Sequence, residues 1–229
     1  MGGCTVSNFA SILYYSDSQL DKGIEKLCID HLPDLPTVSV TKEPLDLGKN
    51  IVSTTPKSYQ SLFEDILMGL EAATEEIVFF VEADILYHPN HFEFTPSYPN
   101  TVYYNGNYWV VRMSDGFAVH YNMGPLSGLC AFREDMLKHY RERLAYIKEN
   151  GFNYKMGFEP FTHKRVKWKY WCNMERFYPP YPNLDLFHGN NLTRRKWSPD
   201  KFQTKPTFWY TGTVDTIPGW PNLRAILKL

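Results

Sequence analysis

The stretch Thr74-Glu-Glu-Ile-Val-Phe-Phe-Val-Glu-Ala-Asp-Ile-Leu-Tyr-His-Pro89 decides the fold of this chain of 229 residues. Residues 77–81 form a continuous apolar run, rich in β-branched and aromatic side chains, which predicts a strand buried on both faces of a parallel sheet. Glu82 and Asp84 follow it directly. Ligands bind at the carboxyl ends of strands in open α/β sheets, and carboxylates together with substrate phosphates suit a hard divalent cation there. Solvated or helix-capping acids are the alternative interpretation.

The segment before this strand predicts an amphipathic helix. Residues 61–73 carry one apolar stripe, made by Leu62, Phe63, Ile66, Leu67 and Leu70. Ser61 and Glu64 have the spacing of a capping box, although a helix beginning nearer Ser58 also fits. The order of helix, short polar turn, buried strand and Glu-Ala-Asp, from Tyr59 to His91, resembles the sugar-nucleotide half of GT-A-fold glycosyltransferases. A looser resemblance extends from about Ile12 to His188.

The first third of the chain reads as a β-α-β unit. Residues 9–15 and 37–41 have strand patterns, and residues 20–32 between them place apolar side chains on one helical face. Such a unit begins a parallel, right-handed sheet. We therefore expect the α/β fold class, with a GT-A-like, mostly parallel, Rossmann-like central sheet flanked by helices.

The second half predicts added β structure. Asn105-Gly106 between strand-forming residues is a hairpin signal, and Ser114-Asp-Gly begins a further turn, so we expect a β hairpin or meander. A charged helix should run from about Glu134 to Asn150 and end at Gly151. A last short strand is expected at 184–188.

No internal repeat or second domain is evident in the sequence. We expect residues 1–229 to form a single catalytic domain. Its nucleotide-binding half would be about 9–90, its acceptor and sugar half about 100–200, and residues 201–229, rich in Pro and Trp, would be a wrapping tail or a lid.

Composition fits a compact enzyme without a global charge. The net charge is −1, so no overall field recruits nucleic acid. The aromatic content is high, with 16 Tyr, 15 Phe and 6 Trp; part of it serves the core, and sugar-binding clefts also use flat amphipathic rings. The four cysteines have no metal-ligand spacing, and Cys28 and Cys130 are expected to be buried thiols. No apolar run approaches a membrane span and no signal peptide is evident, which predicts a soluble, cytoplasmic protein.

The resemblance implies a metal-assisted transfer. Mn²⁺ or Mg²⁺ would be held by Asp84 and the late His188, with Glu82 as a further candidate, although the family's first acid is Asp. The ends of the first two strands would hold the base and ribose of the donor. The positions matching these ends are Tyr15, Ser16 and Asp17, and then Lys42 and Glu43. The nearby Lys49 would offer a cation to a phosphate, and plain turns are the alternative interpretation of these positions.

The resemblance also implies where the sugar and the acceptor bind. A small-residue segment under the donor sugar matches Ser127 and Gly128, and Glu159 matches the catalytic carboxylate of family-2-like inverting enzymes. A solvated loop acid is the alternative for Glu159. Flat aromatic rings and basic groups favour Trp109 and Arg194 as further sugar or acceptor contacts.

The expected function is therefore transfer of a sugar from a nucleotide-diphospho-sugar to an acceptor hydroxyl, with inversion. A glycan is the expected acceptor, while the basic and aromatic run at 163–171 leaves a modified nucleic acid open. Two other classes remain as alternatives. One is a sugar-phosphate nucleotidyltransferase, for which a Gly-rich phosphate loop after the first strand is lacking. The other is a non-catalytic module that binds carbohydrate or nucleic acid.

Overall fold

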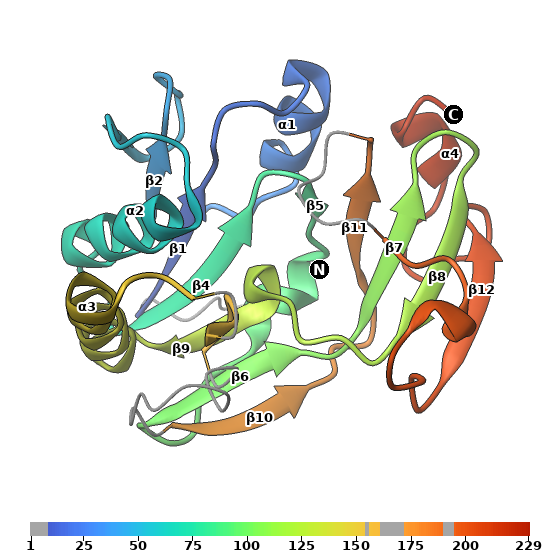
Figure 1. Ribbon diagram of the computed structural model, residues 1–229. Helices are drawn as coiled ribbons and strands as arrows, with labels where there is room; N and C mark the ends of the chain where they lie inside the picture. The colour runs from blue at the N-terminus through green and yellow to red at the C-terminus, as the bar shows by residue number, and fades with distance from the viewer. Residues whose placement is uncertain (1–8, 154–155, 161–171, 190–194) are drawn as a thin grey trace.

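A computed structural model describes residues 9–153, 156–160, 172–189 and 195–229. Two sheets organise the chain (Figure 1). The seven-stranded sheet has the order β10-β6-β9-β4-β1-β2-β3, and the five-stranded sheet has the order β12-β8-β7-β11-β5. The first contains β1 (Ala10–Tyr15), β2 (Thr37–Thr41), β3 (Lys49–Val52), β4 (Ile77–Glu82), β6 (Thr101–Asn105), β9 (Leu129–Phe132) and β10 (Asn173–Phe177). The second contains β5 (Ile85–Leu86), β7 (Tyr108–Arg112), β8 (Phe117–Tyr121), β11 (Asn183–Phe187) and β12 (Trp209–Thr213).

The seven-stranded sheet is mostly parallel, as predicted. Strands β3, β2, β1 and β4 run parallel to one another, and β6 pairs in parallel with β10. Strand β9 is antiparallel to both of its neighbours, β4 and β6. The predicted strand at 77–81 is β4, and all five of its apolar residues are buried.

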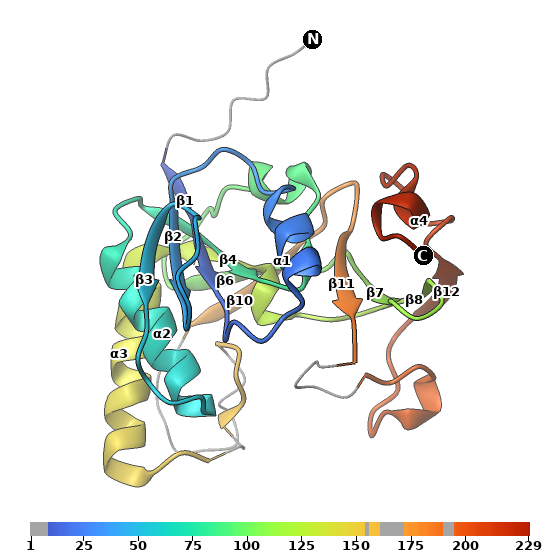
Figure 2. The same ribbon diagram turned by 90° about the horizontal axis from the view of Figure 1, so that it is seen from above.

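Helices cover this sheet on both faces (Figure 2). Helices α2 (Tyr59–Ala72) and α3 (Arg133–Asn150) pack together against one face, in a core that includes Leu13, Phe63, Phe80 and Tyr140. Helix α1 (Lys22–Ile29) and the five-stranded sheet lie on the other side. The short helix α4 (Leu223–Ile226) packs on the second sheet in the same core cluster as Cys28 of α1. The chain is therefore a mixed α/β protein with a central sheet flanked by helices.

The helix ends follow local capping chemistry. Helix α2 begins at Tyr59, because Ser58 is its N-cap and forms the capping box with Ser61. Of the two predicted starts of this helix, the one nearer Ser58 is confirmed, and the capping box of Ser61 with Glu64 is wrong. Helix α3 ends at Gly151, which has a φ of 77° and so forms a stop that glycine adopts without strain.

The predicted hairpin at Asn105-Gly106 is wrong, because the two flanking strands belong to different sheets. The Gly106 N–H donates to the carbonyl of Phe177 at 2.9 Å, and the Asn105 side chain accepts from the N–H of Asn107 at 2.7 Å. These bonds carry the chain from β6 into β7 of the second sheet. The meander begins one turn later, where β7 pairs antiparallel with β8.

The last segment of the chain contributes to the second sheet. Strand β12 pairs antiparallel with β8, and Trp220 donates from Nε1 to the carbonyl of Pro182 at 2.8 Å. Three short 3₁₀ helices complete the described secondary structure: η1 (Pro89–Glu93), η2 (Leu126–Gly128) and η5 (Pro199–Lys201). None of the described helices is long and apolar enough to cross a membrane.

Candidate active site

The order of the parallel strands creates a binding position between β1 and β4. The chain passes from β1 outward through β2 and β3, and helix α2 then returns it to β4 on the other side of β1. Open α/β sheets bind ligands outside the carboxyl ends of the strands at such a switch point. The residues that end the two strands, Tyr15 and Glu82, are register partners there.

Glu82 is fixed in place by two tyrosines. The Tyr15 hydroxyl donates to Glu82 Oε1 at 2.9 Å, and the Glu82 N–H donates to the Tyr87 hydroxyl at 3.0 Å. Tyr87 is fully buried and donates in turn to the carbonyl of Ser127 at 2.9 Å. This relay ties the predicted sugar-binding segment to the acidic end of β4.

The electrostatics around Glu82 favour an added positive charge. Burial and the neighbouring charge of Asp84 raise the pKa of Glu82 to about 8, against the opposing effect of the Tyr15 hydrogen bond. Two carboxylates in a partly buried site repel each other, and a bound cation removes that repulsion.

Asp84 and His188 lie side by side although they are far apart in sequence. Oδ2 of Asp84 is 3.8 Å from Nε2 of His188, and the side chains are 26% and 10% exposed. Strand β11 brings them together, because the N–H of Leu186 donates to the carbonyl of Asp84 at 2.9 Å. Both side chains thus lie close to the carboxyl edge of β4.

A second buried carboxylate, Asp185, was not identified from the sequence. It is 1% exposed, forms an ion pair with Arg195, and has one oxygen, Oδ1, without a hydrogen-bond partner among the described residues. Burial raises its pKa to about 6, while Arg195 opposes the rise and Asp84 adds to it. The sequence did carry a signal: Asp185 stands between two leucines in a predicted strand. A carboxylate buried in a strand requires a charged or hydrogen-bonding partner, which points to a nearby cation.

The donor set suits a cation that also binds phosphate. Carboxylate oxygen and imidazole nitrogen are ligands that Mn²⁺ accepts, and Mg²⁺ commonly takes one or two protein carboxylates plus substrate phosphates. Within the described ranges, no group of three or more His, Cys, Asp and Glu side chains is arranged to hold a metal ion. The protein therefore offers Asp84 and His188 as an adjacent pair, while Glu82 is engaged by Tyr15.

Four of the predicted nucleotide-binding residues follow the carboxyl ends of β1 and β2. Ser16 and Asp17 shape the turn after β1, since their side chains accept from the N–H groups of Ser18 and Gln19, each at 3.1 Å. The Ser18 hydroxyl accepts from the N–H groups of Lys42 and Glu43 at 3.1 and 3.2 Å, which joins the ends of the two strands. Tyr15, Ser16, Asp17 and Glu43 therefore border one edge.

Lys49 and Trp109 are not brought to this edge. Lys49 opens β3 and pairs with Val38, so it lies at the amino end of the sheet, three residues or roughly 10 Å from the carboxyl end. Trp109 pairs with Leu184, so it lies on the face of the second sheet opposite to Asp185, and its ring stacks on that of His120 with centroids 5.4 Å apart.

Ser127 and Gly128 lie in the buried helix η2. A Cβ on Gly128 would stand 3.0 Å from the ring of Tyr108, so the absence of a side chain makes room for that tyrosine. Arg194 and the basic run at 163–171 lie outside the described residues.

Glu159 lies in a turn, 156–160, that follows α3, and its side chain is partly exposed. Gly157 in this turn has a φ of 70°, a conformation natural to glycine. Burial raises the pKa of Tyr140, and the charges of both Glu159 and Glu82 add to that rise. The two carboxylates therefore act on the same buried phenol from different parts of the chain.

Comparison with known proteins does not assign a family. No family model matches the sequence, and no curated protein matches it. Among solved structures, the chain is similar to a glycosyltransferase involved in the glycosylation of the major capsid of PBCV-1, with a TM-score of 0.42 and 11% sequence identity over 74% of this chain and 82% of that one. A similarity this distant carries no weight for the site or its chemistry.

Proposed function

We propose that the chain is a metal-dependent glycosyltransferase of GT-A type that moves a sugar from a nucleotide-diphospho-sugar to an acceptor hydroxyl with inversion. One observation carries the proposal. The switch point between β1 and β4 gathers Glu82, Asp84 and His188 at the edge where open α/β sheets bind ligands. The close sequence resemblance over residues 59–91 supports the same assignment.

In this proposal Asp84 and His188 would hold Mn²⁺ or Mg²⁺, with the donor's diphosphate supplying further oxygens. The bound ion would offset negative charge on the departing nucleoside diphosphate. Glu82, held by the Tyr15 hydroxyl, would face the ribose or a water on the ion. Tyr15, Ser16, Asp17 and Glu43 would border the nucleoside, and Ser127-Gly128 the sugar.

Glu159 is proposed as the general base. Displacement with inversion needs a carboxylate near the acceptor hydroxyl, on the face of the sugar away from the diphosphate. The turn that carries Glu159 comes from a different element than β4, and its charge reaches Tyr140 as that of Glu82 does. Glu159 would accept the proton of the acceptor hydroxyl while the acceptor oxygen attacks the anomeric carbon, the bond from that carbon to the diphosphate breaks, and the nucleoside diphosphate leaves.

A glycan is the proposed acceptor, and a modified nucleic acid is the second candidate. The nucleotidyltransferase alternative lacks a glycine-rich phosphate loop after β1, where the chain instead has Ser16-Asp17-Ser18. A binding module without catalysis does not by itself account for Asp84 and His188 meeting at the end of β4.

A panel of nucleotide-diphospho-sugars with Mn²⁺ tests this assignment. Slow release of nucleoside diphosphate from one donor is the expected result. The Asp84→Asn variant should fold normally and lose this release. The matched control is Asp30→Asn, which changes an exposed carboxylate paired with Lys26 on α1. Release of pyrophosphate from a nucleoside triphosphate would instead show a nucleotidyltransferase, and binding without turnover would show a binding module.

A further inference from the structure

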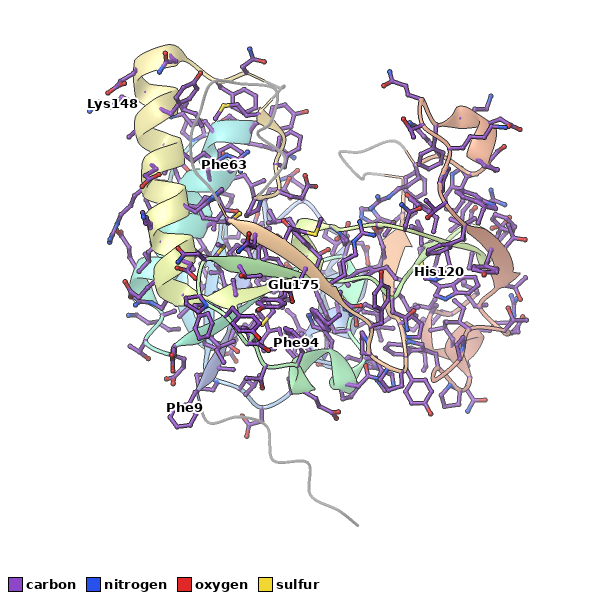
Figure 3. All side chains as sticks on the ribbon, turned by 90° about the horizontal axis from the view of Figure 1, so that it is seen from below. Phe9, Phe63, Phe94, His120, Lys148 and Glu175 are labelled. Atoms are coloured by element: carbon purple, nitrogen blue, oxygen red, sulfur yellow. The ribbon has the colours of Figure 1, made fainter. Side chains whose placement is uncertain are left out.

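Helix α3 contains a fully buried arginine. Arg143 is 0% exposed, and its guanidinium carbon lies 4.0 Å from the centroid of the Phe63 ring on α2. Figure 3 shows Phe63 on the inner side of these helices, while Lys148 extends outward from α3. A buried guanidinium is costly unless its donors are used.

The two terminal nitrogens of Arg143 donate to the turn that carries Glu159. Nη1 donates to the carbonyl of Phe158 at 2.8 Å, and Nη2 donates to the carbonyl of Gly157 and, at 3.4 Å, to that of Met156. Three successive carbonyls of one turn thus accept from one guanidinium. A lysine ammonium cannot reproduce this planar fork.

The same turn is held from two other sides. The Tyr104 hydroxyl donates to the carbonyl of Pro160 at 3.0 Å. The Phe158 ring packs against that of Tyr59, with centroids 4.9 Å apart, and Met156 is fully buried. Residues on both sides of Glu159 are therefore anchored, so the position of its backbone is fixed.

We propose that Arg143 is a positioning residue for Glu159, and that its role in turnover is to hold the 156–160 turn where the carboxylate can meet the acceptor hydroxyl. This inference rests on the proposed function. Arg143 touches carbonyl groups of the turn and acts through the residue that the turn carries.

The electrostatics agree with this role. Burial lowers the pKa of Arg143, and the charge of Glu159 is among the effects that oppose the fall. The charge of Glu159 therefore favours the charged guanidinium that donates to the turn.

The first test measures the turn itself. Arg143→Met and Arg143→Lys are compared with Arg141→Met, which removes an exposed arginine of the same helix that pairs with Glu71 at 2.9 Å. Hydrogen exchange of the peptide spanning 156–160 should accelerate at least about tenfold in both Arg143 variants and stay slow in the control. Unchanged exchange in the Arg143 variants would overturn the positioning role, whatever their enzymatic activity. If Arg143→Met does not fold, Arg143→Lys alone provides the test.

The second test measures coupling to Glu159. With the donor found by the panel, Arg143→Lys should lower kcat about 10- to 100-fold with little change in donor KM, because a small displacement of a catalytic group costs about that much. Added to Glu159→Gln, the same change should have almost no further effect on kcat. Full additivity would overturn the inference. Normal kcat in Glu159→Gln alone would instead show that the proposed base is wrong, while the exchange result would still show whether Arg143 holds the turn.

Discussion

Oδ2 of Asp84, just after β4, and Nε2 of His188, just after β11, are 3.8 Å apart. The two strands belong to different sheets, so this contact joins the end of the central sheet to the end of the second sheet. A carboxylate and an imidazole at this distance can share one cation after small side-chain movements. The proposed chemistry depends on this junction.

Loss of the Glu159 carboxylate should slow the transfer step and leave donor binding intact. General-base assistance contributes about 10²–10⁴-fold in rate, so Glu159→Gln should lower kcat by about that factor. Glu175→Gln on β10, where the carboxylate is exposed, is the matched control and should behave as wild type. An NMR assignment of the product should show inversion at the anomeric carbon. Retention of configuration, or a kcat near wild type, would exclude Glu159 as the base.

Lys42 should prove to be a structural residue. Its Nζ lies 2.7 Å from Asp65 Oδ2 and donates to the hydroxyls of Ser53 and Thr55, and the Lys42 and Asp65 side chains are 17% and 9% exposed. Lys42→Met leaves a largely buried carboxylate without its cation, which should cost about 3 kcal/mol of unfolding free energy in urea. Lys26→Met, which breaks an exposed pair, should cost less than about 1 kcal/mol. Equal losses in the two variants would contradict the prediction.

His91 should make the protein less stable in mild acid. It is fully buried, burial lowers its pKa to about 3, and its Nδ1 accepts from the Asn105 side chain at 3.0 Å. In the unfolded chain a histidine titrates near 6.5, so below that pH the unfolded state binds a proton that the folded state excludes, and stability falls until about pH 3.

The size of this effect can be isolated with His91→Gln, which has no titrating group. Between pH 6.5 and pH 5.0 the wild type should lose about 1.6 kcal/mol more unfolding free energy than the variant, because each pH unit contributes up to about 1.4 kcal/mol once the unfolded histidine is mostly protonated. Urea unfolding at the two pH values measures the difference. A parallel loss in both proteins would mean that His91 is protonated in the folded state.

Much of the fold was predictable because its signals are local. The apolar run of β4, the stripe of α2 and the glycine after α3 each act within one element, and the structure confirms them. The Asn105-Gly106 turn failed because long-range pairing decided it: β6 pairs with β9 and β10, while β7 pairs with β8 and β11. A dipeptide signals that the chain bends, and only the partners decide which sheet it then joins.

The candidate site was predictable in part for the same reason. Parallel strands place their carboxyl ends on one edge, which is why Tyr15 and Glu82 meet there. Lys49 does not reach the carboxyl edge of the sheet. The chain returns after β2 to the amino end of that strand, and β3 begins there with Lys49 opposite Val38. The ion pair of Asp185 with Arg195 depends on how the second sheet packs, which no local pattern reports.

The most direct test of the metal-dependent transfer is donor turnover with and without the divalent ion. Release of nucleoside diphosphate from the matching donor should proceed in Mn²⁺ or Mg²⁺, stop in EDTA, and return when the ion is restored. Asp84→Asn and His188→Asn should fold normally and show about 10²-fold less release or lower, while Asp30→Asn should match the wild type. Turnover that persists in EDTA, or in Asp84→Asn, would contradict the proposed metal site.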